Sequence, residues 1–323
     1  MRRGKVIGAV ALLAGAAVYL NNTSYLASPP ADRPSLLAHR GLHQTYDRTG
    51  LTDETCTAAR IDHPTHPHLE NTIASIQAAF ELGADVVELD VHPTTDGHFA
   101  VFHDWTLDCR TDGHGVTREH SLAALKALDI GYGYTADGGK TYPFRGKAIG
   151  LMPSLSEVLT AFPRQGLLIN VKSNDGDEGR RLADALAQLP RDRLERIMVY
   201  GGDRPIRELR RRLPQLRTMS RATLKSCILR YALTGWVGYV PDACRNTLLL
   251  VPTNVGPWLW GWPHAFLGRL ARHDTLVFAV GPYHGGDFSN GINTPDELAL
   301  LPRNYAGGIW TDRIDVLGKL VAK

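Results

Sequence analysis

The stretch GADVVELDVHPTTDGHFAVFHD, residues 83–104, combines the pattern of a buried strand with charged side chains. Its β-branched run 86–91 predicts a strand, which Glu88 and Asp90 interrupt at a spacing of two. That spacing places both carboxylates on one face. Buried like charges are costly unless a cation lies between them, and a divalent metal ion is the simplest such partner. The alternative is a strand edge with solvated acids. A second strand, 99–102, follows and ends in His103 and Asp104.

Two further motifs lie upstream of this stretch. A short apolar strand, Leu36–His39, leads into Arg40 and Gly41. Glu70, Asn71 and Thr72 open a predicted helix over residues 70–82, which Gly83 ends. Both motifs place polar groups at the end of an apolar element.

In chain order, His-Arg-Gly, Glu-Asn-Thr, Gly-Ala-Asp, Glu-x-Asp, Asp-Gly and His-Asp resemble the glycerophosphodiester phosphodiesterase family. This family lies within the superfamily of phosphatidylinositol-specific phospholipases C. Beyond Asp112 the resemblance is weaker and depends on Lys172 and on the segment Gly308–Asp312. It implies an eight-stranded barrel and a metal-dependent phosphodiesterase.

Strand and helix patterns alternate along the rest of the chain. Strands are predicted at 36–39, 86–91, 167–171, 197–200, 216–219, 248–251, 276–280 and 308–310, with 99–102 as a continuation or partner of the second. Helices are predicted at 70–82, 154–162, 179–189, 205–213, 222–233, 263–271, 295–301 and 313–321. This alternation favours parallel strands with helical crossovers, and the resemblance implies the same fold, a (β/α)8 TIM barrel. We therefore predict an α/β barrel domain over residues 35–323 with an inserted loop after strand 1.

Phosphodiester cleavage needs charge stabilisation, a base and an acid, and candidates for each lie at predicted strand ends. Glu88 and Asp90 are the predicted ligands of one divalent cation, Ca²⁺ or Mg²⁺, because hard cations prefer oxygen donors. Arg40 and Lys172 are predicted to bind the phosphate. His39 and His103 remain as the acid and base pair. The resemblance implies that the glycerol hydroxyl attacks first and that water then opens a cyclic intermediate.

Glu70 and Asn170 are further candidate metal ligands. Glu70 could instead stabilise the start of a helix or form a structural ion pair with Arg40. The family pattern has Glu-x-Lys where this chain has Asn170, Val171 and Lys172. Asn170 offers a carbonyl oxygen without a charge, so we expect a weaker metal site.

The insertion 42–69 is rich in histidine and aspartate, which suggests either a second metal site or a substrate-side lid or surface loop. Its histidines lack a helical i, i+4 register, so we interpret it as a lid or surface loop. Its relevant residues are His43, Asp47, Asp53, Asp62, His63, His66 and His68.

Residues 1–34 predict a targeting segment and linker. Basic residues precede an apolar run, Val6–Leu20, which is typical of an export signal. No well-formed cleavage site follows, so we favour an uncleaved membrane anchor and a domain facing the periplasm or cell exterior, or a secreted domain if the signal is cleaved. The run is shorter than the roughly 20 residues of a comfortable span.

Four cysteines suit an oxidising compartment and allow three pairings. We favour Cys56 with Cys109 and Cys227 with Cys244, and four unpaired thiols are the alternative. A net charge of +3 in 323 residues gives no nucleic-acid signature, and the run Arg207–Arg212 is interpreted as a solvated helix face.

These features predict an enzyme, a phosphoric diester hydrolase that converts small glycerophosphodiesters to glycerol 3-phosphate and an alcohol. One alternative is phospholipase C or D type cleavage of a membrane lipid, and another is a binding module with weakened catalysis. Tryptophans 236, 258, 260 and 262 could line an alcohol pocket, contact lipid or pack internally. The sequence does not determine the alcohol, the metal or the oligomeric state.

Overall fold

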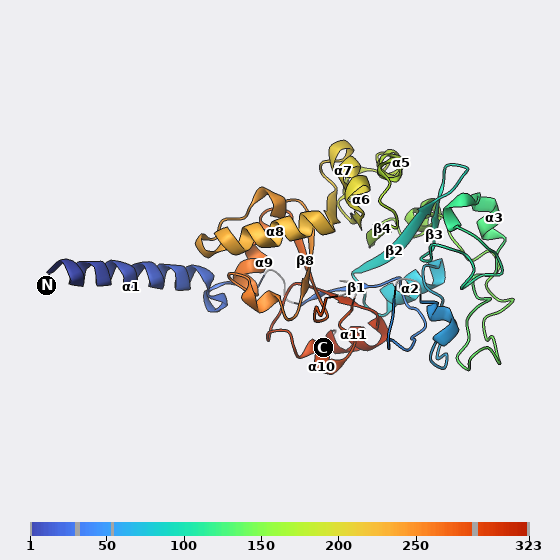
Figure 1. Ribbon diagram of the computed structural model, residues 1–323, viewed down its shortest axis with the longest axis horizontal. Coiled ribbons are helices and arrows are strands. Elements are labelled where there is room, and N and C mark those ends of the chain that lie inside the picture. Colours follow the sequence, from blue (N-terminus) through green and yellow to red (C-terminus); the bar gives the residue numbers. More distant parts are fainter. Residues whose placement is uncertain (1, 30–32, 53–54, 286–289, 322–323) are drawn as a thin grey trace.

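Strand β2 (Val86–Pro93) is buried along its whole length, as its apolar run predicts. The computed structural model describes residues 2–29, 33–52, 55–285 and 290–321. Within them, parallel strands follow the order β6-β5-β4-β2-β1-β9-β8-β7 (Figure 1). The other strands are β1 (Ser35–Ala38), β3 (Phe99–Val101), β4 (Gly166–Val171), β5 (Ile197–Gly201), β6 (Arg217–Ser220), β7 (Leu248–Pro252), β8 (Leu276–Val280) and β9 (Gly308–Thr311). All lie close to their predicted ranges.

The sheet curls into a nearly closed barrel. Its two end strands, β6 and β7, lie next to each other, and no ladder joins them in the described part of the chain. The Thr247 hydroxyl crosses this seam and donates to the carbonyl of Thr218 at 2.6 Å. Strand β3 lies outside the barrel order and pairs antiparallel with β2, so it is a partner of β2 rather than its continuation. The predicted (β/α)8 architecture is confirmed.

Most helices connect the strands or cover the barrel, whereas α1 precedes the first strand and extends away from it (Figure 1). The helices are α1 (Arg2–Asn22), α2 (Ile73–Glu81), α3 (Leu122–Lys126), α4 (Leu155–Ala161), α5 (Gly176–Leu186), α6 (Arg191–Leu194), α7 (Asp203–Arg212), α8 (Arg221–Thr234), α9 (His264–Ala271), α10 (Pro295–Leu298) and α11 (Ile314–Val321). The predicted start of α2 at Glu70 is wrong, because the Thr72 side chain caps the helix by accepting from the Ser75 N–H. The outer face of α7 is exposed at Arg207, Arg211 and Arg212, as predicted.

The insertion after β1 is not simply a surface loop. Its residues Ala58, Ile61 and Leu69 share a second hydrophobic core with residues from the segment 102–152, such as Leu107 and Phe144. Figure 1 shows the two segments together at the end of the molecule opposite α1. A small subdomain therefore flanks the barrel. Asp53 of the insertion lies outside the described residues.

Both favoured disulfides are present. Cys56–Cys109 joins the two segments of the small subdomain, and Cys227–Cys244 joins α8 to the short helix η5 (Asp242–Cys244) before β7. Each cross-link restricts the unfolded chain and so stabilises the folded state.

Candidate active site

His39 follows β1 and is held by a carboxylate from the other end of the chain. Its Nδ1 lies 2.6 Å from Oδ1 of Asp312, which follows β9, the neighbour of β1 in the barrel. The carboxylate accepts from Nδ1–H, and this tautomer leaves Nε2 free to accept a proton. Burial raises the pKa of Asp312, but the hydrogen bond and charge of His39 and the charge of Arg48 hold it well below its usual range.

The turn after His39 directs the backbone N–H of Arg40 towards Glu88 inside the barrel. Arg40 has a left-handed φ of 56°, a conformation that costs energy for a non-glycine residue. Its N–H donates to Oε2 of Glu88 at 3.2 Å. Gly41 follows with φ 78°, and a Cβ there would lie 2.3 Å from the Ser75 hydroxyl oxygen. The close approach to α2 therefore requires glycine at position 41.

Glu88 and Asp90 point to the same side of β2, into the barrel, as their spacing predicts. Glu88 accepts from the Tyr200 hydroxyl at 2.7 Å and lies 3.8 Å from Nε2 of His39. Burial and the neighbouring Asp90 raise the pKa of Glu88 to about 7.

Asp90 has more positive charge around it. Its carboxylate lies 3.5 Å from Nζ of Lys172 and 3.2 Å from Nε of Arg40. The side chains of Asn71 and Asn170 also donate to it, at 3.1 and 2.9 Å. Burial raises the pKa of Asp90, but Lys172 and Arg40 hold it well below its usual range.

Glu70 lies beside this pair and not at a helix start. One of its oxygens is 3.3 Å from Nη1 of Arg40 and the other is 3.0 Å from Nη1 of Arg110. Burial raises the pKa of Glu70, but the two guanidinium groups outweigh this and lower it. The structural ion pair considered for Arg40 and Glu70 is thus present.

His103 repeats the arrangement of His39. It follows β3, and its Nδ1 lies 2.7 Å from Oδ1 of Asp104. Asp104 is in turn bound by Nε of Arg110 at 2.8 Å. Burial and the positive charge of Arg40 lower the pKa of His103 to about 4, so this imidazole is neutral near pH 7.

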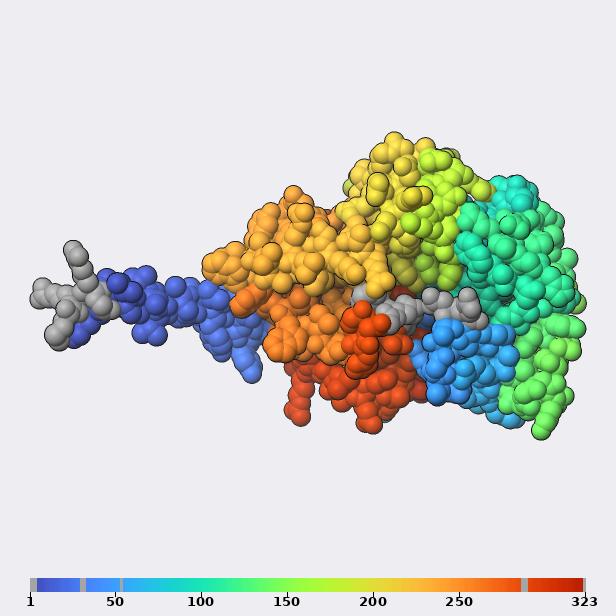
Figure 2. All heavy atoms as spheres, in the orientation of Figure 1, coloured from blue at the N-terminus to red at the C-terminus, as the bar shows by residue number. Residues whose placement is uncertain are grey.

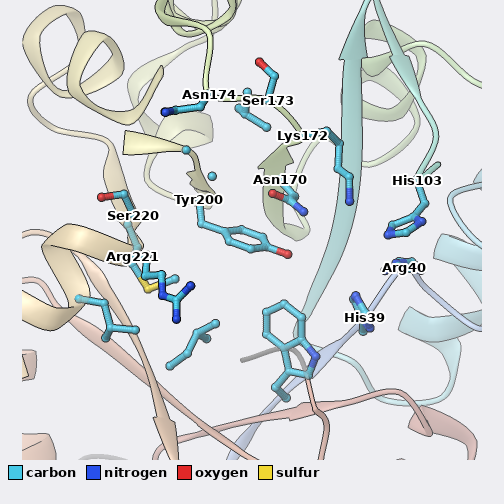
Figure 3. A pocket seen from close by; sticks show the side chains of 17 residues that line it. His39, Arg40, His103, Asn170, Lys172, Ser173, Asn174, Tyr200, Ser220 and Arg221 are labelled. Carbon is cyan, nitrogen blue, oxygen red and sulfur yellow. The ribbon is translucent and has the colours of Figure 1, made fainter. Parts of the chain in front are cut away.

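These side chains meet at a cavity of about 450 Å³, shown in Figure 3. His39, Arg40, His103 and Lys172 gather on one side, and Ser220 and Arg221 lie across from them, beyond Tyr200. Glu88 and Asp90 are fully buried beneath this lining. The structure therefore brings all eight predicted residues to one place. None of the four tryptophans considered for an alcohol pocket lines this cavity.

The donor chemistry fits a hard divalent cation at Glu88 and Asp90. Two buried carboxylates face the same space, and burial together with the charge of Asp90 raises the pKa of Glu88 to about 7, so a cation between them would favour its charged form. Glu70 is already paired with two guanidinium groups, and Asp90 with Lys172 and Arg40, so Glu88 is the carboxylate of the three with the least cationic pairing. Asn170 presents its amide nitrogen to Asp90 and adds no charge.

A second group of possible ligands lies next to this site. Among the described residues, His39, His43 and Asp312 are the one set of three donors within 4.8 Å of one another. Asp312, however, already interacts with Arg48 at 2.6 Å and Asn293 at 2.9 Å, as well as with His39. Of the four histidines in the insertion, His43 is the one that belongs to this group of ligands.

Sequence reasoning missed several groups that support the predicted residues. Asp312 was part of a recognised segment but had no role, and Tyr200 and Arg110 were not considered. Asp90, Asn170 and Tyr200 are register partners across β2, β4 and β5, so a polar side chain at the end of β5 was the available signal.

Known proteins resemble this chain in sequence and in fold. The sequence profile of the glycerophosphoryl diester phosphodiesterase family matches residues 39–200, which is half of the chain. A glycerophosphodiester phosphodiesterase from Caldanaerobacter subterraneus subsp. tengcongensis is 41% identical over 107 residues. That match covers 33% of this chain and 40% of the relative, so the similarity spans well under half of either protein.

Solved structures share the fold over a longer range. The glycerophosphoryl diester phosphodiesterase domain of a Mycobacterium tuberculosis protein covers 90% of this chain and 99% of its own, with a TM-score of 0.63 and 18% identity. An Oleispira antarctica phosphodiesterase in complex with the product sn-glycerol-3-phosphate covers 89% and 97%, with a TM-score of 0.55 and 19% identity.

Proposed function

The chain belongs to the glycerophosphoryl diester phosphodiesterase family, and from this premise we propose that it hydrolyses glycerophosphodiesters to glycerol 3-phosphate and an alcohol. The observation that carries the proposal is the pair of histidines at one cavity. His39 and His103 each have a carboxylate on Nδ1, from Asp312 and Asp104. Two imidazoles oriented in this way suit a reaction that needs both a base and an acid.

The residues divide the work as follows. Arg40 and Lys172 attract the phosphate to the cavity and stabilise charge on its oxygens. One histidine takes the proton of the glycerol hydroxyl as its oxygen attacks phosphorus, and the other protonates the leaving alkoxide. Water then opens the cyclic diester with the two roles exchanged. Burial and the charge of Arg40 lower the pKa of His103 to about 4, so its imidazole is in the neutral form that can accept a proton in the first step.

We place one divalent cation, Ca²⁺ or Mg²⁺, at Glu88 and Asp90, with Glu70 and Asn170 as further candidate ligands. When bound, such an ion neutralises negative charge on the phosphoryl oxygens. Tyr200 and Asn71 then orient the two carboxylates through the hydrogen bonds described above.

The amino-terminal segment supports a proposed location outside the cytoplasm, attached to a membrane. Helix α1 contains an apolar window, Lys5–Asn22, with a mean hydropathy of 1.4 and no buried residues. The 18 residues of this window give a length of about 27 Å, slightly less than the roughly 30 Å hydrocarbon core of a bilayer. The two disulfides suit the same compartment.

The test is release of glycerol 3-phosphate from glycerophosphocholine and glycerophosphoethanolamine by the full chain in detergent, with Ca²⁺, Mg²⁺ or a chelator. We expect metal-dependent release that His39→Ala abolishes. His114→Ala is the matched control, because His114 forms a similar pair with Asp108 at 3.1 Å but is exposed.

Absence of release with every metal would contradict the proposal. Turnover of intact phospholipid vesicles instead would favour the lipid-cleaving alternative. If neither substrate is turned over, the binding module becomes the better account.

A further inference from the structure

The outer face of α8 near its carboxyl end is apolar but uncovered. Leu229 and Leu233 are four residues apart on this face, and their exposed fractions are 67% and 76%. Val237, in the 3-10 helix η4 (Gly235–Val237) that follows α8, is 55% exposed. The opposite face of the helix packs Leu224, Cys227 and Tyr231 into the barrel core. The helix therefore has two apolar faces, and only one of them meets the protein.

More apolar side chains extend this face around the foot of α1. We use the name collar for Tyr25, Leu233, Trp236, Val237, Trp258 and Trp260, whose exposed fractions range from 39% to 93%. Hydrogen bonds hold the collar segments together. The Trp260 indole donates to the carbonyl of Ala232 at 2.9 Å, and the Ser24 hydroxyl donates to the carbonyl of Gly261 at 3.1 Å.

The polar end of α1 is fixed to the same region. The side chains of Asn21 and Asn22 donate to the carbonyl of Trp236 at 3.1 and 2.8 Å. The buried Arg269 donates to Oδ1 of Asn22 at 3.0 Å and also to the carbonyl of Asn21. Beyond this junction α1 stands clear of the molecule, as Figure 2 shows. The helix and the collar are thus joined by specific contacts rather than by a loose linker.

The composition of the collar indicates what covers it. Tryptophan and tyrosine are enriched where proteins meet the surface of a bilayer, because their rings combine an apolar body with a polar edge. Arg230 lies three residues before Leu233, and the segment 226–241 contains no acidic residue. Basic residues beside an apolar face match anionic lipid headgroups.

We propose that the collar lies in the headgroup region of the membrane that α1 crosses and so holds the barrel in one orientation on the bilayer. This rests on the membrane attachment proposed above. Helix α8 then sets the height of the cavity, because Arg221 and Leu224 at its start line the cavity while Thr234 at its end adjoins the collar. Its 14 residues span about 21 Å. Figure 1 shows α8 lying along the long axis that α1 extends.

This height bears on the substrate. The cavity-lining Leu224 and the collar residue Leu233 are nine residues apart on α8, about 14 Å, so the cavity stands above the headgroup level and is open to soluble glycerophosphodiesters. An intact phospholipid would have to leave the bilayer to reach it. The arrangement therefore favours a deacylated, water-soluble diester over the lipid-cleaving alternative.

The experiment uses the full chain in vesicles of phosphatidylethanolamine and phosphatidylglycerol, with a nitroxide spin label on Leu233→Cys. Arg211→Cys on the exposed face of α7 is the matched control. We expect several-fold fewer collisions with a water-soluble nickel complex, and more with lipid-soluble oxygen, for the label at 233 than for the label at 211. Vesicle flotation reports attachment separately, and glycerol 3-phosphate release reports the proposed activity separately.

Three results would overturn the proposal. The first is that the chain fails to float with the vesicles. The second is that the label at 233 is as accessible to nickel as the label at 211. The third is that the 233 spectrum shows spin–spin broadening from a second copy. If the chain floats and the label at 233 is lipid-exposed but no glycerol 3-phosphate is released, the proposed function is contradicted and the proposal for the collar still holds.

Discussion

The cavity and the collar each reverse the usual distribution of residues, but in opposite ways. At the cavity Glu88 and Asp90 are charged and fully buried, whereas at the collar Leu233 and Trp258 are apolar and 76% and 85% exposed. The cost of the first arrangement is partly offset inside the chain, because Lys172 and Arg40 lie against Asp90 and the Tyr200 hydroxyl donates to Glu88. The cost of the second has no such offset in the described residues. Buried charge therefore points to chemistry within the protein, and exposed apolar surface points to a partner outside it.

The largest effect should come from the residue that orients His39. Asp312→Asn removes the charge that selects the tautomer of His39, so we expect kcat to fall by about 10²–10⁴-fold. Asp108→Asn, the same change beside the exposed His114, is the control and should leave kcat unchanged. Steady-state kinetics with a soluble diester measures both. Equal rates for Asp312→Asn and the wild type would contradict the claim that buried charge at the cavity serves the chemistry.

Breaking the charge network should destabilise the fold. Arg110→Met leaves Glu70 and Asp104 buried with fewer partners, and we expect a loss of about 3–5 kcal/mol in the free energy of unfolding. Arg60→Met breaks a more exposed pair with Asp47, and we expect a much smaller loss because solvent screens that pair. Urea denaturation measures both values. A similar small loss in the two variants would mean that the buried charges do not depend on Arg110.

The pH dependence of stability tests whether the buried negative charge of Glu88 destabilises the fold. Its pKa rises from 4.5 to about 7 on folding, so the folded state binds the proton more tightly. With a chelator present, the contribution of Glu88 to stability should be full below pH 4.5 and fall by about 3 kcal/mol as the pH rises to about 7. Denaturation of Glu88→Gln should lack this slope, and an identical slope in both proteins would contradict the account.

Adding a charge beside Asp90 should strengthen metal binding. Asn170→Glu supplies a third carboxylate, and calorimetry should report a several-fold lower Kd for Ca²⁺ or Mg²⁺. Asn174→Glu is the control, because Asn174 also lines the cavity while its side chain accepts from the backbone N–H of Arg204. Unchanged affinity in Asn170→Glu would place residue 170 away from the ion.

The smallest effect is expected at the collar. Leu233→Ser in detergent should change the free energy of unfolding by less than about 0.5 kcal/mol, because the side chain packs against nothing that folding orders. Leu224→Ser on the buried face of the same helix is the contrasting variant and should cost several kcal/mol. A large loss for Leu233→Ser would show that the protein itself covers this face.

Sequence patterns predicted the features that depend on residues close together in the chain. The strand ranges followed from apolar runs, and the positions of His39 and His103 followed from strand ends. The start of α2 was misplaced because a carboxylate at Glu70 looks like a helix-start acid, although the capping hydroxyl belongs to Thr72.

The partners of these residues depend on closure of the barrel and could not be read locally. Asp312 is 273 positions from His39, and Tyr200 is 112 positions from Glu88. The small subdomain escaped prediction for the same reason, because its core forms only when the insertion meets the segment after β3. The sequence predicted a helix over residues 222–233 but not its exposed apolar face, since periodicity does not say which of two apolar faces is covered.

The most direct test of the central claim compares His39→Ala, His103→Ala and the double variant in release of glycerol 3-phosphate, with His114→Ala as control. The account predicts that each single substitution lowers the rate by about 10²–10⁴-fold and that the double variant is little slower, because the two imidazoles act in the same steps. A variant of either histidine that keeps the wild-type rate would contradict the assignment of this cavity as a two-histidine active site.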